Sequence, residues 1–238
     1  MTNESIKNLI NQLNGTISQP VYKVYKYQIS DNVEYGKVWY ELEPNHQIES
    51  NFFFIKENKS YAGAIQILGA NLHWYILESE RNKGYLTNAL NTAILPFLFS
   101  EMNYEKIKIT IPNTEDNDAL ASAAVAKKVG FKNIDNVVYV LLSDQFDFTN
   151  ENLSIRFPGI KLKEYERLKN EINEISIRLQ QIHTQFEFST GLKMKKYQNP
   201  PLDEIAEILA LRRHSLEDMY HDHLIKDDIN FKNETPKQ

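Results

Sequence analysis

A short segment near the middle of the chain combines residue types that could hold a phosphate group. The sequence ESERNKGYLTNAL, residues 78–90, places Arg81, Lys83, Gly84 and Thr87 at the start of a helical pattern. The first N–H groups of a helix lack intrahelical partners and carry partial positive charge, so they attract anions. Glycine lets a backbone approach such a ligand closely, and basic or hydroxyl side chains add donors. The segment is therefore a candidate phosphate site, with an ordinary strand-to-helix turn as the alternative.

The elements that would position this segment alternate between strand and helix patterns. A helix is predicted over residues 5–13 and is followed by a β-rich region in which turn-like residues 31–36, 43–47 and 57–60 separate the strands. Helices are predicted from Tyr85 onward and over residues 118–130, the second ending at Gly130. This order predicts a mixed sheet with helices on its faces. The predicted strands cover residues 21–29, 37–43, 51–57, 61–68, 72–78, 106–111 and 137–143.

The last third of the chain has a different pattern. Apolar residues from Tyr165 to Phe186 recur at alternating spacings of three and four, which is typical of a heptad seam. A second apolar helix pattern starts at Leu202, after a loop with Gly191 and two prolines. We expect a domain over residues 1–148 and an antiparallel helical hairpin over 149–238. The apolar face of the hairpin must pack on the domain, on itself or on another chain, as in a homodimer. The seam residues are Tyr165, Leu168, Ile172, Ile175, Leu179, Ile182 and Phe186.

Composition narrows the classes of function. The 238 residues carry a formal net charge of -5, which gives no general attraction to nucleic acid or to anionic membranes. No apolar run could span a bilayer and the N-terminus does not resemble a signal peptide, so a cytoplasmic protein is expected. The chain has no cysteine, which excludes thiolate chemistry. Three histidines between His214 and His223 lie among acidic residues, but a solvated helix face explains them better than a metal site, and no metal is predicted.

Two motifs in a compatible order resemble the GNAT family of acetyltransferases. The segment from Arg81 is similar to the family's loop for the acetyl-CoA pyrophosphate, Arg/Gln-x-x-Gly-x-Gly/Ala, with Arg81 and Gly84 in place and Leu86 at the last position. The helix from Ser122 to Phe131 is similar to the family's Ser-x-x-Val-x-x-Lys-x-Gly-Phe pattern. Both motifs look most like the branch that acetylates the N-termini of ribosomal proteins. The resemblance implies a mixed, largely antiparallel sheet flanked by helices.

The resemblance also implies a chemistry and a set of binding residues. An acetyl group would pass from acetyl-CoA to a primary amine, of a small molecule or a protein N-terminus, by direct attack. The backbone N–H of Ile76 would polarise the thioester carbonyl, with Trp74 beside the pantetheine arm. Asn117 lies two residues from the position of a family asparagine that contacts pantetheine, and the competing role, which we favour, is that it or Asp116 caps the helix. The pyrophosphate loop would consist of Arg81, Asn82, Lys83, Gly84, Tyr85, Leu86 and Thr87.

Catalytic residues are assigned on the same basis. Many family members protonate the leaving thiolate with a tyrosine at the position of Ala126, so the resemblance transfers this role to Ser122. Packing of a small residue in a helix is the alternative for that serine. Glu78 is the first candidate for the general base, ahead of His73 and Tyr139, and it could instead stabilise a helix start. A water chain to bulk solvent would also serve as the base.

Two other classes of function stay open. The replacements at Leu86 and Ala126 are compatible with a catalytically inactive GNAT-fold protein that binds acyl-CoA as a sensor or scaffold. An interaction protein assembled through its C-terminal helices, without a cofactor, is the third possibility.

Overall fold

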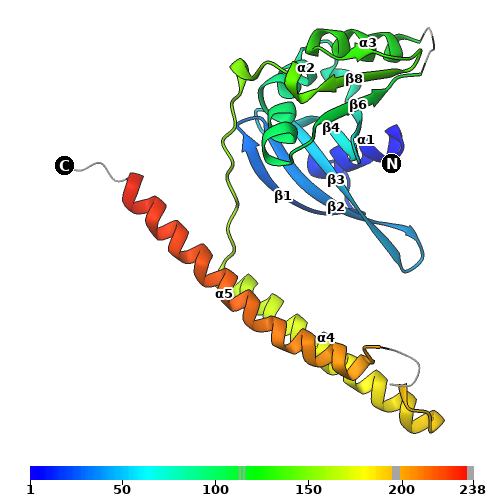
Figure 1. The fold of residues 1–238 in the computed structure, drawn as a ribbon, viewed down its shortest axis with the longest axis vertical. Helices are drawn as coiled ribbons and strands as arrows, with labels where there is room; N and C mark the ends of the chain where they lie inside the picture. Colours follow the sequence, from blue (N-terminus) through cyan, green and yellow to red (C-terminus); the bar gives the residue numbers. More distant parts are fainter. Residues whose placement is uncertain (113, 115, 195–198, 235–238) are drawn as a thin grey trace. The chain divides into compact units, whose positions relative to one another are not determined.

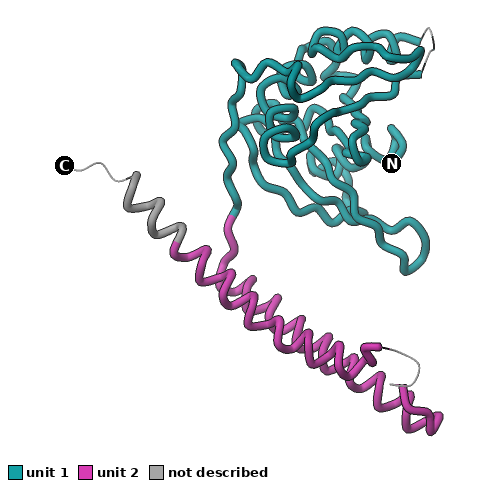
Figure 2. Tube along the Cα trace, in the orientation of Figure 1, with its two compact units in different colours: residues 1–158 teal, residues 159–238 magenta. Residues whose placement is uncertain are grey.

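The computed structural model describes residues 1–112, 114, 116–194 and 199–234, with side chains up to residue 225 in the last helix. The chain forms two compact units, residues 1–158 and residues 159–238 (Figure 1, Figure 2). The predicted mixed, largely antiparallel sheet flanked by helices and the C-terminal helix pair are both confirmed.

The N-terminal unit contains an eight-stranded sheet in the order β1-β2-β3-β4-β5-β6-β8-β7. All neighbouring strands are antiparallel except β5 and β6, which are parallel. The strands are β1 (Lys23–Ser30), β2 (Val33–Glu43), β3 (His46–Glu57), β4 (Ser60–Leu68), β5 (Asn71–Ile76), β6 (Lys106–Thr110), β7 (Lys132–Asn133) and β8 (Val138–Leu142).

The helices of this unit lie on both faces of the sheet (Figure 1). The smaller core joins α1 to one face through Ile6, Leu9 and Ile10, which a helix of period 3.6 places on one side. The larger core joins α2, its continuation and α3 to the other face. The helices are α1 (Asn3–Leu13), α2 (Tyr85–Ala89), which continues through π-helical turns at Leu90–Ile94 and Phe97–Glu101, and α3 (Asn117–Val129); short 3₁₀ turns lie at Glu78–Glu80, Ser143–Gln145 and Phe148–Asn150.

Two turns are shorter than predicted, because the prediction assigned the first residues of the following strands to them. Residues 31–36 were expected to form a turn, but β2 begins at Val33. Gly36 lies inside that strand, where an added Cβ would come within 2.7 Å of the carbonyl oxygen of Tyr25 on β1. A glycine can therefore mark close approach of neighbouring strands as well as a turn. Likewise β3 begins at His46, within the turn expected over residues 43–47.

The segment after the sheet belongs to the N-terminal unit. The backbone N–H of Ser154 donates to the carbonyl of Ile29, at 2.7 Å, and Arg156 pairs with Gln28 at the outer edge of β1. These bonds extend the unit to residue 158, whereas the boundary was expected at 148.

The C-terminal unit is an antiparallel hairpin of α4 (Leu162–Thr190) and α5 (Leu202–Glu234). Tyr165 stacks on Tyr220 with ring centroids 4.3 Å apart, and Lys169 bonds Glu217. The seam between the helices departs from the expected heptad, because Ser176 is buried in it while Ile175 is exposed. Ile182 and Phe186, also expected in the seam, are exposed as well.

Candidate functional site

The central feature of the candidate site is an opening between β5 and β6. Their parallel ladder holds only two residue pairs among the described residues, Asn71 with Lys108 and Leu72 with Ile109. Strand β5 continues to Ile76 on its β4 side alone. The two central strands therefore separate after Leu72 and leave one edge of β5 without a strand partner.

The backbone alternation of β5 shows which groups face this opening. The N–H of Leu77 donates to the carbonyl of Ala62, at 2.9 Å, so odd-numbered residues of β5 turn their backbone groups toward β4. The carbonyl of Ala70 accepts from Lys108 on β6, at 2.7 Å, as expected for the even-numbered residues. The N–H groups of Trp74 and Ile76 consequently point into the opening. Both residues were predicted from the sequence to contact the donor.

Trp74 also connects this edge to α3. Its indole Nε1–H donates to the hydroxyl oxygen of Ser122 at 3.2 Å. The structure thus brings together the predicted pantetheine contact and the predicted acid, which are 48 residues apart in the chain. Since an indole only donates, the Ser122 hydroxyl acts as acceptor here and keeps its own hydrogen available.

The loop before α2 presents uncapped backbone donors. Asn82 and Gly84 have φ angles of 62° and 82°, so two left-handed residues lead the chain into the helix. Gly84 is the N-cap of α2, and no side chain caps this end. An added Cβ at Gly84 would meet no protein atom within 4 Å, so the space above the loop is open. The Tyr85, Leu86 and Thr87 N–H groups lie in the first turn, where no intrahelical acceptor is available.

The two departures from the family pattern have different structural settings. The Leu86 side chain is 8% exposed and packs in the larger core, beneath the loop. It therefore leaves the outer surface of the helix start unobstructed. Ala126 is fully buried in the same core. Ser122, one helical turn earlier, supplies the hydroxyl on this helix that contacts Trp74.

Arg81 bridges β5 and α3 at the mouth of the opening. Its Nε donates to the carbonyl of Ile76 at 3.2 Å, and its Nη1 donates to Asp118 at 2.7 Å. Lys83, the second predicted cation, pairs with Glu80 at 2.9 Å. Both cations are thus neutralised by carboxylates of the chain. Sequence reasoning did not identify Asp118, which was visible only as an acidic residue in the first turn of α3.

The start of α3 is capped by Asp116. Its Oδ1 accepts from the N–H of Ala119 at 2.7 Å. Asn117, predicted as a possible cofactor contact, is the first residue of the helix and is exposed. Asn113, considered with it, lies outside the described residues.

Glu78, the predicted base, is held on the α1 side of the sheet. Its carboxylate accepts from the Tyr75 hydroxyl at 2.7 Å and pairs with Lys7 of α1 at 3.3 Å. The hydrogen bond from Tyr75, with smaller contributions that include Lys7, lowers the pKa of Glu78 to about 2. Burial and the same hydrogen bond raise the pKa of Tyr75 to about 12. Ser122 lies beyond the other face, so the two predicted catalytic side chains approach β5 from opposite sides.

The other two base candidates are separated in the same way. The His73 ring shares a hydrogen bond with Asn3 of α1 at 2.8 Å, and burial, assisted by the nearby N-terminal ammonium, lowers its pKa. Tyr139 packs in the larger core on the α3 side. The geometry therefore favours neither His73 nor Tyr139 as the general base.

A buried ionic cluster with members on β1, β2, β3 and β4 was missed from the sequence. Glu34 is almost fully buried and accepts from Lys26 at 2.8 Å, Lys56 at 3.1 Å and the Tyr61 hydroxyl at 2.8 Å. Burial alone would raise the pKa of Glu34, but these hydrogen bonds outweigh it and hold the pKa below its ordinary value. The charged residues alternate with apolar residues along the strands. This pattern does not indicate which charged residues of different strands will lie close together.

In the described part of the chain no group of three histidine or carboxylate side chains is arranged to hold a metal ion. His214 instead contacts Glu217 at 3.0 Å, and Glu217 also bonds Lys169. Among the helices described, none has the length and apolar character needed to cross a bilayer.

Comparisons with known proteins identified no relative of this chain. No protein-family model matches the sequence, and a search of curated proteins gave no match.

Proposed function

We propose that residues 1–158 form a GNAT-type N-acetyltransferase that uses acetyl-CoA and a primary amine. The observation that carries the proposal is the opening between β5 and β6, into which the N–H groups of Trp74 and Ile76 point, with Ser122 of α3 bonded to the Trp74 side chain. The order of elements around it, strand–helix–strand–helix–strand with one parallel pair, supports the same assignment.

The residues present fit the donor. The uncapped start of α2 offers backbone N–H groups to a pyrophosphate, and the space above Gly84 is open. Arg81 and Lys83 stand beside it as cations that can exchange their present carboxylate partners for phosphate oxygens. The free edge of β5 offers the alternating donors and acceptors that an extended amide-containing arm requires.

Acetyl-CoA would supply the acetyl thioester that the amine attacks. The Ile76 N–H, with that of Trp74, would donate hydrogen bonds to the carbonyl oxygen as negative charge develops on it. Ser122, whose oxygen is already engaged by Trp74, would donate its hydrogen to the departing sulfur. Packing against the larger core holds Trp74 and Ile76 in position for these roles.

The amine must lose a proton, and Glu78 is poorly suited to accept it. A carboxylate with a pKa of about 2 is a weak base, and its Tyr75 and Lys7 contacts hold it on the α1 side. We therefore assign Glu78 to fastening α1 to the end of β5, and proton release to water at the open strand edge. Its role as base stays a prediction that a variant can test.

An acyl-CoA-binding protein without turnover is the second candidate. Among the described residues no side chain is well placed as a base, and this finding and the alanine at position 126 favour it. Both candidates require the same donor site, so binding and turnover have to be measured separately.

Thermal unfolding with and without acetyl-CoA tests the donor site. At one hundred times its Kd, a ligand that binds only the folded state adds about 2.7 kcal/mol to the free energy of unfolding. We expect this stabilisation with acetyl-CoA and with CoA, and a much smaller one with acetyl-pantetheine, which lacks the pyrophosphate. No shift with acetyl-CoA would reject both candidates.

Thiol release with a panel of primary amines and N-terminal peptides then separates the two candidates. Turnover with any acceptor supports the enzyme, whereas stabilisation without turnover supports the binding protein. The nature of the acceptor and a cytoplasmic location stay predictions from the sequence.

A further inference from the structure

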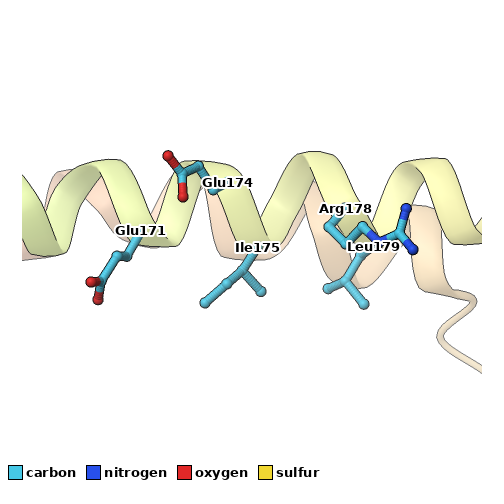
Figure 3. Close-up of a pocket in the computed structure, with 5 residues that line it drawn as sticks. All are labelled: Glu171, Glu174, Ile175, Arg178 and Leu179. Atoms are coloured by element: carbon cyan, nitrogen blue, oxygen red, sulfur yellow. The ribbon is translucent and has the colours of Figure 1, made fainter.

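The hairpin of α4 and α5 carries a stripe of exposed apolar side chains beside its internal seam. On α4 the stripe contains Ile175, Ile182 and Phe186, which are 53%, 38% and 52% exposed. Their spacings of seven and four residues keep them on one side of a helix. Figure 3 shows Ile175, Leu179 and Glu171 pointing to the same side of α4, away from Glu174. These residues, together with Glu174 and Arg178, border a shallow hollow of about 390 Å³.

Helix α5 carries a matching stripe. Ile205, Ile208 and Met219 are 37%, 45% and 67% exposed. At about 100° per residue, the stripe on each helix lies roughly a quarter-turn from the seam and in the same rotational sense. Because the helices are antiparallel, equal rotations in the same sense bring both stripes to one face of the hairpin. We call these six side chains and the surface between them the apolar hairpin face.

The internal seam of the hairpin contains polar groups as well as apolar side chains. It contains Ser176, whose hydroxyl donates to the carbonyl of Ala206 at 2.7 Å, the His183 ring, whose Nδ1 lies 3.6 Å from the Asp203 carboxylate, and Arg213 Nε, which is buried without a hydrogen bond to the described residues. Buried polar groups without partners are costly. A pair of amphipathic helices gains stability when a second layer covers its apolar side.

The dimensions of this face suit a stable interface with an identical hairpin. The 29 residues of α4 extend about 44 Å at 1.5 Å per residue. Two helices packed 8–10 Å apart present a face roughly 20 Å wide. Each copy would thus cover on the order of 800–900 Å², close to the ~800 Å² per partner of standard stable interfaces.

Charges on the same face are complementary to a second copy. Arg212 lies within the α5 stripe and makes no ion pair or hydrogen bond with any described side chain. Glu171 points to this side from α4, where its carboxylate also bonds Arg167 of the same helix. Since Tyr165 stacks on Tyr220 and Lys169 bonds Glu217, position 171 is level with about residue 215, one turn from Arg212. A two-fold axis parallel to the helices sets α4 of each copy against α5 of the other and brings Glu171 near the second copy's Arg212 twice.

We propose that the apolar hairpin face binds the same face of a second copy, forming an antiparallel four-helix bundle that joins two chains. This inference concerns residues 159–238 and is independent of the acetyltransferase assignment. The occupant that competes with a second copy is the N-terminal unit of the same chain, which would leave the protein monomeric.

Sedimentation and light scattering of the full chain test the proposal. The expected mass is twice the 27.8 kDa of one chain at micromolar concentration. Ile182→Asp places a charge inside the proposed interface and should weaken dimerisation roughly a hundredfold or more. The control is Ile177→Asp, at an isoleucine of the same helix that is 46% exposed on the opposite face, which should leave the dimer intact. A monomeric wild type, or equal effects of the two variants, would overturn the proposal.

Charge reversal provides a test that does not depend on core packing. Glu171→Arg and Arg212→Glu should each weaken the dimer roughly fivefold, and the double variant should recover it. Circular dichroism would verify that helix content is unchanged. Because the wild-type chain has no cysteine, mixing Glu171→Cys chains with Arg212→Cys chains should give a covalent dimer containing one of each. Disulfides between identical variants in preference to mixed ones would rule out the proposed axis.

Discussion

The indole N–H of Trp74 on β5 donates to the hydroxyl of Ser122 on α3, at 3.2 Å, beside the opening between β5 and β6. This bond orients the serine oxygen toward the strand edge and leaves the serine hydrogen free to be donated. It links the residue proposed to lie beside the donor's arm with the residue proposed to protonate its sulfur. A change at either residue is therefore expected to affect the other.

Ser122→Ala is expected to lower kcat by about 10- to 100-fold, the range for loss of a general acid, with little change in the KM for acetyl-CoA. Ser122→Thr keeps a hydroxyl and should retain more activity. Lys127→Ala, on an exposed part of the same helix, serves as control. Steady-state kinetics would decide the matter, and an unchanged kcat for the alanine variant would remove Ser122 from its role.

Gly84→Asp is expected to abolish stabilisation by acetyl-CoA, because its carboxylate would stand over the uncapped helix start and repel a pyrophosphate. The matched variant is Gly84→Asn, which has nearly the same size and the same strain at a φ of 82°. Both should unfold at similar temperatures without ligand, since the space at Gly84 is open. Thermal shifts should survive in the asparagine variant only. Equal shifts in both would contradict a phosphate site at this loop.

Asp118→Asn is expected to tighten donor binding by releasing Arg81 from its ion pair. Exposed pairs are worth about 0.2–1 kcal/mol, so the Kd for CoA should fall by no more than about fivefold. Calorimetry at low and high salt would measure the effect. Weaker binding in this variant would indicate that Asp118 positions Arg81 for the ligand instead of competing with it.

Glu34→Gln is expected to destabilise the N-terminal unit by about 2–3 kcal/mol, because Lys26 and Lys56 would lose the carboxylate that compensates their partial burial. Since folding lowers the pKa of Glu34, its stabilising effect is present above the ordinary value of 4.5 and is lost as pH falls through the folded value. Urea unfolding should thus show the two proteins converging below pH 4.5. The more exposed Lys37–Glu49 pair provides the control, and Glu49→Gln should cost less than about 1 kcal/mol.

Glu78→Gln is expected to keep kcat within about threefold and to lower the melting temperature slightly, since Tyr75 and Lys7 lose a charged partner. A carboxyl with a pKa of about 2 should contribute no titration to the rate profile above pH 4. A large loss of kcat, together with loss of the acidic limb of that profile, would restore Glu78 as the general base.

The order of elements was predictable because hydrophobic periodicity records which side of an element is buried. The helix start at Tyr85 and the stop at Gly130, with a φ of 102°, followed from local backbone chemistry. The opening between β5 and β6 could not be predicted in the same way, since it depends on where two strands stop pairing. Leu86 illustrates the limit, because the sequence shows it only as a departure from the family's Gly/Ala, and its burial shows that the side chain lies below the loop.

The sequence also did not predict to which face of the sheet each side chain points. Adjacent strand residues point to opposite faces, so Tyr75 draws Glu78 toward α1 while Trp74 meets Ser122. In the hairpin, a regular heptad predicted Ile175 in the seam, but the contacts with α5 follow the neighbouring position Ser176. A shift of one residue on a helix changes the buried face by about 100°, which sequence spacing alone does not resolve.

For the proposed donor site, the ion pair between Arg81 and Asp118 has a consequence for which acyl carriers would bind. A carrier would have to displace an internal carboxylate from Arg81, and only a group with comparable negative charge would do so without net loss. Thioesters of small uncharged thiols would reach the strand edge but would not displace Asp118 from Arg81. The same two side chains that fasten β5 to α3 would thus act as a filter for carriers that bear phosphate.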